Sequence, residues 1–159
     1  MNNPVLKTLS FIFDNDNDLL LMHQMVEDGP LKRKHSGIKG NIEPTEDINT
    51  AAIRSLQEAA NLEIEEMVLR GIIKTVHQEN HTSAIYFIYE SALFSGELEK
   101  KISGQLKWVD ILNVFNLQME SVVLEIMPNL LDGESFFEGM ILLNDQDEVL
   151  ESDIRICNR

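Results

Sequence analysis

Residues 37–62, GIKGNIEPTEDINTAAIRSLQEAANL, divide into a glycine-containing loop and one amphipathic helix. At 100° per residue, one side of the helix is mostly small and apolar, as packing requires: Asn49, Ala52, Ile53, Leu56 and Ala60. Asp47 is expected to cap the start of the helix, and Asn61 to stand at its end. The pattern therefore predicts a helix over residues 47–61 with Ala52, Ile53 and Leu56 buried.

A second side of this helix carries polar residues. Arg54, Ser55 and Glu58 gather there, with Ala59 at the edge, and Arg54 and Glu58 can pair because they lie four residues apart. We expect Arg54 and Glu58 to face a cleft and positions 55 and 59 to face solvent.

The spacing of this stretch resembles the Nudix box, which is Gly, five residues, Glu, seven residues, then Arg-Glu-aliphatic-any-Glu-Glu-any-Gly-aliphatic. Six positions match it at the right spacing: Gly40, Glu46, Arg54, Leu56, Glu58 and Leu62. Three positions depart from it, because Ser55 and Ala59 stand where the family has Glu and Asn61 stands where it has Gly.

The resemblance implies a hydrolase that cleaves a pyrophosphate bond in a nucleoside diphosphate linked to another group, and the layout is similar to the MutT-type enzymes that act on nucleoside triphosphates. Such enzymes use a divalent metal, usually magnesium (Mg2+) and in some cases manganese (Mn2+), which prefers carboxylate and phosphate oxygens and activates water. By resemblance, Glu58 and Arg54 are the catalytic residues, Glu58 and Glu46 the metal ligands, and Gly40 a substrate-binding residue.

The departures from the box fall on the acids that bind metal, so the sequence predicts weak metal binding and weak or absent hydrolysis. The alternative is a non-catalytic module on the same fold that binds a nucleotide or a protein partner. In that case Glu58 is simply a surface residue paired with Arg54.

A second region resembles the family's Glu-rich loop before a Trp-containing strand. Aligned on Gly104 and Trp108, the positions that carry acids in the family are Ser103 and Gln105 here, and neither is a carboxylate. Glu97 and Glu99 lie earlier in the loop and are possible substitutes. Trp108 is a candidate for the wall of a base-binding pocket; the alternative is a core tryptophan.

Charge restricts the partners. The 159 residues carry a net charge of −14, which argues against nucleic acid polymers and anionic membranes but allows a nucleotide that arrives with its metal. The one dense group of cations, residues 32–35, includes Lys34. It is either a rim that attracts substrate phosphates or a solvated loop.

Other features are those of an ordinary globular chain. Cys157 is the single cysteine, so neither a disulfide framework nor a cysteine metal site is expected. Residues 4–13 do not form a signal peptide, and no apolar run has the length of a membrane span. The cytoplasm is the expected location.

Apolar runs with many β-branched and aromatic residues predict strands over residues 5–13 and 19–26, 65–78 and 83–93, and 136–143 and 148–156. Polar turns between the runs make each pair a hairpin, and a short strand is expected over residues 105–109. Helical spacing from Leu117 to Leu131 predicts a second helix, kinked or interrupted at Pro128. The expected class is α/β. By resemblance it is the Nudix fold, a mixed β-sheet sandwiched between helices, in one domain over residues 1–159.

Overall fold

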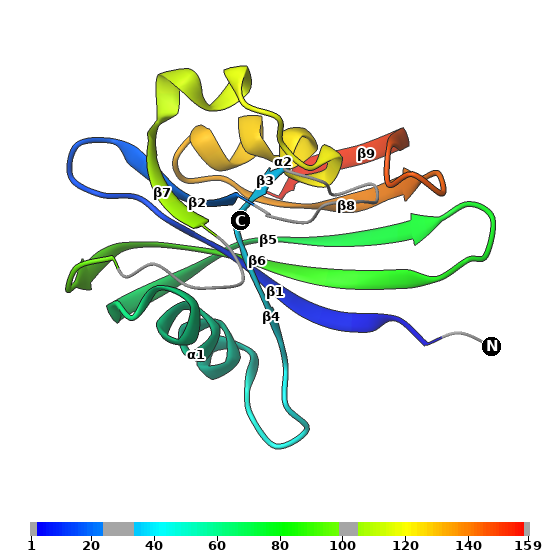
Figure 1. The fold of residues 1–159 in the computed structure, drawn as a ribbon. Coiled ribbons are helices and arrows are strands. Elements are labelled where there is room, and N and C mark those ends of the chain that lie inside the picture. Colours follow the sequence, from blue (N-terminus) through cyan, green and yellow to red (C-terminus); the bar gives the residue numbers. More distant parts are fainter. Residues whose placement is uncertain (1–2, 24–33, 99–104, 158–159) are drawn as a thin grey trace.

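The computed structural model describes residues 3–23, 34–98 and 105–157, and its largest element is a six-stranded mixed sheet (Figure 1). The strands, in their order across the sheet, are β4 (Ile38–Asn41), β1 (Val5–Ile12), β6 (Ser83–Ser95), β5 (Glu63–His77), β8 (Phe136–Leu143) and β9 (Val149–Cys157). β1 is parallel to β6 and β5 is parallel to β8, whereas the other neighbours are antiparallel. The predicted β5–β6 and β8–β9 hairpins are confirmed.

A three-stranded sheet contains β3 (His35–Ser36), β2 (Asp18–His23) and β7 (Gln105–Asp110), in that order. The hairpin predicted from the first two apolar runs is therefore wrong, because β1 and β2 belong to different sheets and meet at an isolated bridge between Phe13 and Leu19. The reason is that β4 and β6 occupy both edges of β1, so β2 pairs with β3 and β7 instead.

Helix α1 (Ile48–Ala60) has the predicted ends. The Asp47 carboxylate accepts the backbone N–H of Thr50 at 2.8 Å, and Asn61 has the left-handed conformation that ends many helices. Ala52 and Leu56 are buried as expected, but Ile53 is only half-buried. The predicted loop before the helix contains strand β4, because residues 38–41 pair with β1.

Helix α2 (Ser121–Leu131) follows a 3-10 helix, η1 (Ile111–Asn116), so it begins later than the spacing predicts. Pro128 lies inside α2 without interrupting it. Its missing N–H removes one helical hydrogen bond, while burial of Val123, Ile126, Met127 and Leu130 against the sheet compensates.

The two helices cover opposite sides of the large sheet, which confirms the expected α/β architecture (Figure 1). On one side, α1 packs through Leu56 and Ala60 against Ile12 and Leu62. On the other side, α2 packs against a larger core from β1, β5, β6 and β8. Residues of the small sheet enter both cores.

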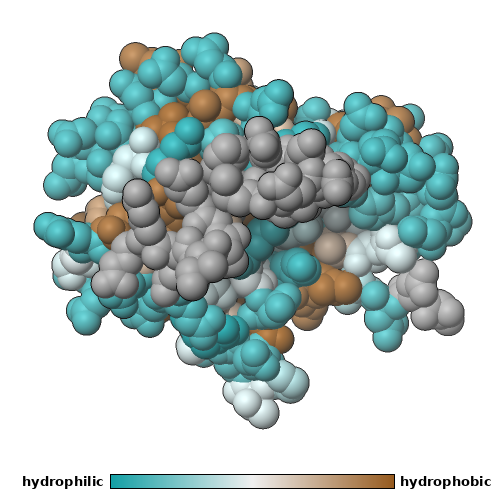
Figure 2. All heavy atoms as spheres, viewed as in Figure 1, coloured by the Kyte–Doolittle hydropathy of each residue, from teal (hydrophilic) through white to brown (hydrophobic). Residues whose placement is uncertain are grey.

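Hydrophilic residues dominate the face seen in Figure 2, with hydrophobic patches between them. Among the described residues, no helix is both long and apolar enough to cross a membrane.

Candidate functional site

Gly40 lets strand β4 lie directly against helix α1. It pairs with Thr8 across the sheet. A Cβ atom at position 40 would lie 1.9 Å from Ser55 Oγ, 2.5 Å from Ser55 Cβ and 2.8 Å from Thr8 Oγ1. A side chain does not fit in that space, so the match of Gly40 to the box has a steric cause in this chain.

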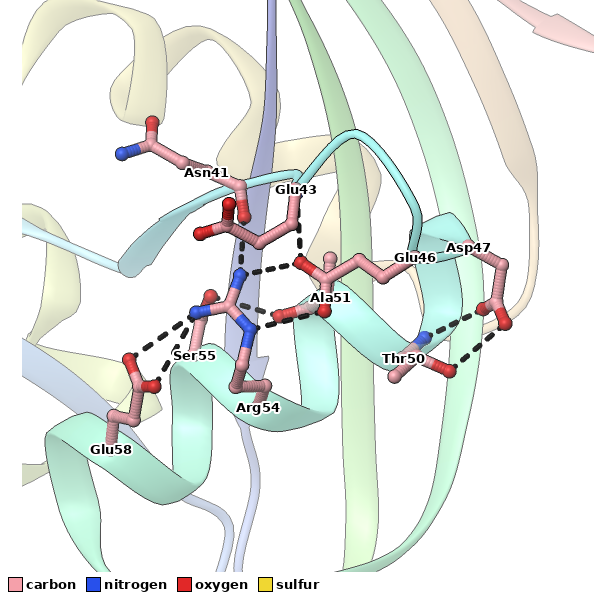
Figure 3. Close-up of polar contacts among 9 residues, drawn as sticks. All are labelled: Asn41, Glu43, Glu46, Asp47, Thr50, Ala51, Arg54, Ser55 and Glu58. Atoms are coloured by element: carbon pink, nitrogen blue, oxygen red, sulfur yellow. Dashed lines mark hydrogen bonds and ion pairs between the residues drawn. The ribbon is translucent and has the colours of Figure 1, made fainter.

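Arg54 joins the loop after β4 to α1 (Figure 3). Its guanidinium donates to both carboxylate oxygens of Glu46, at 2.6 Å from Nη2 and 3.1 Å from Nε. Nη2 also donates to the Asn41 carbonyl at 2.8 Å, and Nη1 donates to Glu58 Oε2 at 3.3 Å. One side chain thus links the two acids that the box resemblance assigns to metal.

These contacts determine the charge state of the site. Hydrogen bonds from Arg54, and a smaller contribution from the Glu43 N–H, lower the pKa of Glu46 below its ordinary value. The same pairing with Glu46, followed by that with Glu58, raises the pKa of Arg54. Both groups are therefore charged at neutral pH, and each acid already has a cationic partner.

Ser55 does not face solvent, which corrects the sequence expectation. Its side chain is buried, and its hydroxyl donates to the Ala51 carbonyl at 2.9 Å beneath Gly40. Ala59 is half-buried and packs against the α1 core rather than standing free on the helix surface. Glu58 is the exposed carboxylate of this helix.

The residues that the structure describes do not form a ready metal site. Within residues 3–23, 34–98 and 105–157, no group of three or more His, Cys, Asp or Glu side chains is placed to hold an ion. Glu46 and Glu58 both contact Arg54, and a cation beside them would experience repulsion from the guanidinium.

The other residues predicted for the site are Trp108, Lys34 and those of the Glu-rich loop. Trp108 stacks on Phe94 with ring centroids 5.6 Å apart and belongs to the core around α1. Lys34 is half-buried just before β3, and its neighbours Lys32 and Arg33 lie outside the described residues. Residues 99–104, which include Glu99 and Ser103, also lie outside them, as does the side chain of Gln105.

A cavity of about 340 Å³ opens on the other side of the sheet, at the N-terminal end of α2. Apolar side chains form much of its wall: Val5, Leu9, Ala84, Val122, Val123 and Leu143. Lys39 Nζ donates to Glu120 Oε1 at 2.7 Å on this wall, and the Glu120 side chain is only 5% exposed. Arg54, Glu58 and Trp108 do not line this cavity.

The cavity has further polar groups. His77 Nε2 and Asp147 Oδ1 are 2.5 Å apart, and both residues line it. Tyr86 contributes a phenol whose pKa is raised by burial. An apolar wall with hydrogen-bonding groups suits a flat ring with polar substituents.

Sequence reasoning missed these cavity residues. Lys39 and Glu120 are 81 positions apart, and no local pattern links them. The one available indication was the position of Lys39 beside Gly40. Side chains alternate along a strand, so when Gly40 faces α1, Lys39 faces the α2 side.

Comparisons with known proteins match the fold described above. The model of the NUDIX domain family matches residues 4–130. A mutator MutT protein from Bacillus halodurans has a similar crystal structure, with a TM-score of 0.85 at 20% identity over 94% of this chain and 97% of that one. The NUDIX domain of Shewanella oneidensis NrtR, crystallised with ADP ribose, has a TM-score of 0.70 at 13% identity over 83% and 89% of the two chains. No curated protein matches the chain in sequence.

Proposed function

This chain belongs to the Nudix family, and we propose that it binds a nucleoside diphosphate derivative and hydrolyses it weakly or not at all. The proposal depends on which residues occupy the metal-binding positions of helix α1. Position 55 is a buried serine beneath Gly40, position 59 is an alanine, and the remaining acid, Glu58, is paired with Arg54. In the family, a divalent metal held by such acids supplies the activated water.

Binding is supported by the cavity beside α2. Lys7 lines it, and in a chain whose net charge is −14 this lysine places positive charge where an anionic ligand needs it. Lys39 also lines the cavity, but Glu120 already pairs with it. The apolar wall and the polar groups around it suit the ring of a nucleotide. The NrtR domain with the similar fold was crystallised with ADP ribose, a ligand of this class.

We expect metal to bind weakly. Magnesium commonly uses one or two carboxylates together with substrate phosphates. Glu58 and Glu46 supply two carboxylates. They can bind the ion only if substrate phosphates provide its other oxygen ligands and Arg54 pairs with those phosphates instead of with the two acids. Calorimetry should therefore detect weak binding of magnesium or manganese to the protein alone and tighter binding with a nucleotide. Tight binding without nucleotide would contradict this.

The deciding experiment is a panel of nucleoside di- and triphosphates and ADP ribose, each with Mg2+ or Mn2+. Phosphate release and thermal unfolding are measured on the same samples. A ligand at 100 times its dissociation constant stabilises the fold by about 2.7 kcal/mol. We expect stabilisation with little or no turnover, and a smaller shift in Lys7→Met than in the control Lys107→Met, because Lys107 lies on β7 away from the cavity.

Each outcome separates the candidate functions. Rapid metal-dependent turnover would contradict the proposal that hydrolysis is weak or lost. The absence of both turnover and stabilisation would remove nucleotide binding and leave the alternative, a protein-interaction module on the Nudix fold. Equal shifts in the two lysine variants would show that the ligand binds outside the cavity.

A further inference from the structure

Two turns at one end of the large sheet contribute polar groups to the cavity beside α2. β5 and β8 run parallel, and His77 at the end of β5 pairs with Leu143 at the end of β8, so the turns that follow them lie close together (Figure 1). His77 Nε2 lies 2.5 Å from Oδ1 of Asp147 in the β8–β9 turn, and the two side chains are 31% and 32% exposed. This pair therefore joins the two turns at a part of the cavity wall that solvent reaches.

Both ring nitrogens of His77 contact an oxygen that can accept a hydrogen bond. Nε2 contacts Asp147, and Nδ1 lies 3.3 Å from Thr82 Oγ1. The Thr82 hydroxyl donates to Asn80 Oδ1 at 2.7 Å, and the Thr82 N–H donates to the same oxygen at 2.9 Å. Thr82 Oγ1 can thus accept from Nδ1 while Asp147 accepts from Nε2. The imidazolium satisfies both contacts at once, because both of its nitrogens are donors.

The neutral ring fits the same site after one rotation. When Nδ1 loses its proton, the Thr82 hydroxyl can turn from Asn80 and donate to Nδ1, while Nε2–H still donates to Asp147. Asn80 Oδ1 keeps its hydrogen bond from the Thr82 N–H. The ring can therefore gain or lose its charge without any rearrangement of the two turns.

The charges on the cavity wall cancel apart from that of His77. The wall contains two lysines, Lys7 and Lys39, and two acids, Glu120 and Asp147. Its formal charge is therefore zero when the imidazole is neutral and +1 when it is protonated. Histidine changes its charge between about pH 5 and about pH 8. Within that range, the proton on His77 decides whether the wall as a whole carries the positive charge that attracts an anion.

The other ionisable groups around this pair do not change charge in the same range, except for one histidine. His77 also lines a polar pocket of about 300 Å³, whose carboxylates are Glu79, Asp145 and Asp147. Carboxylates ordinarily keep their charge above about pH 5. Tyr86 on the cavity wall stays neutral, because burial raises the pKa of its phenol. The exception is His81, whose N–H donates to the His77 carbonyl at 2.9 Å.

We propose that protonation of His77 regulates this cavity, so that an anionic ligand binds more tightly at about pH 6 than at about pH 8. The inference rests on the proposed nucleotide binding and concerns how that binding is controlled. By reciprocity, a bound anion favours the protonated ring, so binding takes up a proton. One charge at a partly exposed site changes affinity by about three- to fivefold, which is the size of effect that we expect.

ADP ribose is a suitable probe, because its own charge is constant over this range. Each of its two phosphates is esterified on both sides, so neither has the second ionisation that a terminal phosphate shows at about pH 6. Calorimetry at a fixed Mg2+ concentration, from about pH 5.5 to about pH 8.5, should show the dissociation constant rising about three- to fivefold. Titrations in two buffers that differ in ionisation enthalpy should show protons taken up on binding.

Three variants test the role of His77. His77→Gln is neutral at every pH and should bind ADP ribose as weakly as the parent chain does at high pH. His77→Lys keeps a positive charge and should bind as tightly as the parent chain does at low pH, and neither variant should depend on pH. The matched control is His81→Asn, because asparagine tolerates the left-handed backbone at that position, with φ 58°. It should keep the pH dependence of the parent chain.

The outcomes distinguish this inference from the proposed function. Binding that does not depend on pH in the parent chain, or a pH dependence that persists in His77→Gln, overturns the role of His77 and leaves nucleotide binding in place. The absence of ADP ribose binding at every pH removes nucleotide binding and the role of His77 with it. Thermal unfolding of each variant verifies that its fold is intact.

Discussion

At the scale of single residues, the contact between Gly40 and Ser55 determines how closely the box strand and its helix approach. Gly40→Ala places a methyl group 1.9 Å from Ser55 Oγ, so β4 or α1 must shift. Overpacking of this kind typically costs about 1–3 kcal/mol. We expect Gly40→Ala to lower the free energy of unfolding by an amount in that range, measured by chemical denaturation.

A second variant identifies the cause of that loss. Ser55→Gly removes both Ser55 atoms that the new methyl group meets, so Gly40→Ala should cost less in the Ser55→Gly background than in the parent chain. Equal losses from Gly40→Ala with and without Ser55→Gly would show that the Ser55 contact is not responsible.

At the scale of elements, Arg70 attaches β5 to the end of α2. Its side chain is 2% exposed, donates to the Leu130, Asn129 and Ser135 carbonyls, and pairs with Glu90 at 3.0 Å. Removing one partner of a buried pair costs about 3–5 kcal/mol. We expect Arg70→Met to destabilise the protein by that order, measured by denaturant unfolding, and Arg70→Met with Glu90→Gln to cost less.

The stability cost of Arg70→Met should depend on pH if the unpaired Glu90 charge is its cause. Burial raises the pKa of Glu90, and Arg70 opposes that rise. Without Arg70 the pKa of Glu90 rises further, so the folded state binds a proton more tightly than the unfolded state does. The cost of Arg70→Met should therefore shrink as the pH falls through that raised pKa. A cost independent of pH would show that an uncompensated Glu90 charge is not its source.

At the scale of the whole molecule, the excess of acids opposes folding. The chain has 27 acidic residues against 13 basic ones. Raising NaCl from about 0.01 M to about 1 M shortens the screening length from roughly 30 Å to roughly 3 Å. We expect the melting temperature to rise over this range, because screening weakens the net repulsion more than it weakens the few ion pairs. A falling melting temperature in calorimetry would show that the ion pairs dominate.

The sequence alone determined the features that depend on local pattern. The α1 boundaries, the β5–β6 and β8–β9 hairpins and the box spacing could all be predicted, because caps, turns and periodicity act over a few residues. The family followed from the same spacing, and with it the expectation of a mixed sheet between helices.

Only the tertiary structure decided which strands pair and what surrounds each side chain. β2 joins a separate sheet because both edges of β1 are occupied, and no local pattern contains that competition. Ser55 is buried because β4 lies against α1 through Gly40, although helical angles alone placed it among polar residues. The cavity depends on Lys39 meeting Glu120 from a distant helix. Such contacts arise from packing between elements, which the order of residues along one element does not specify.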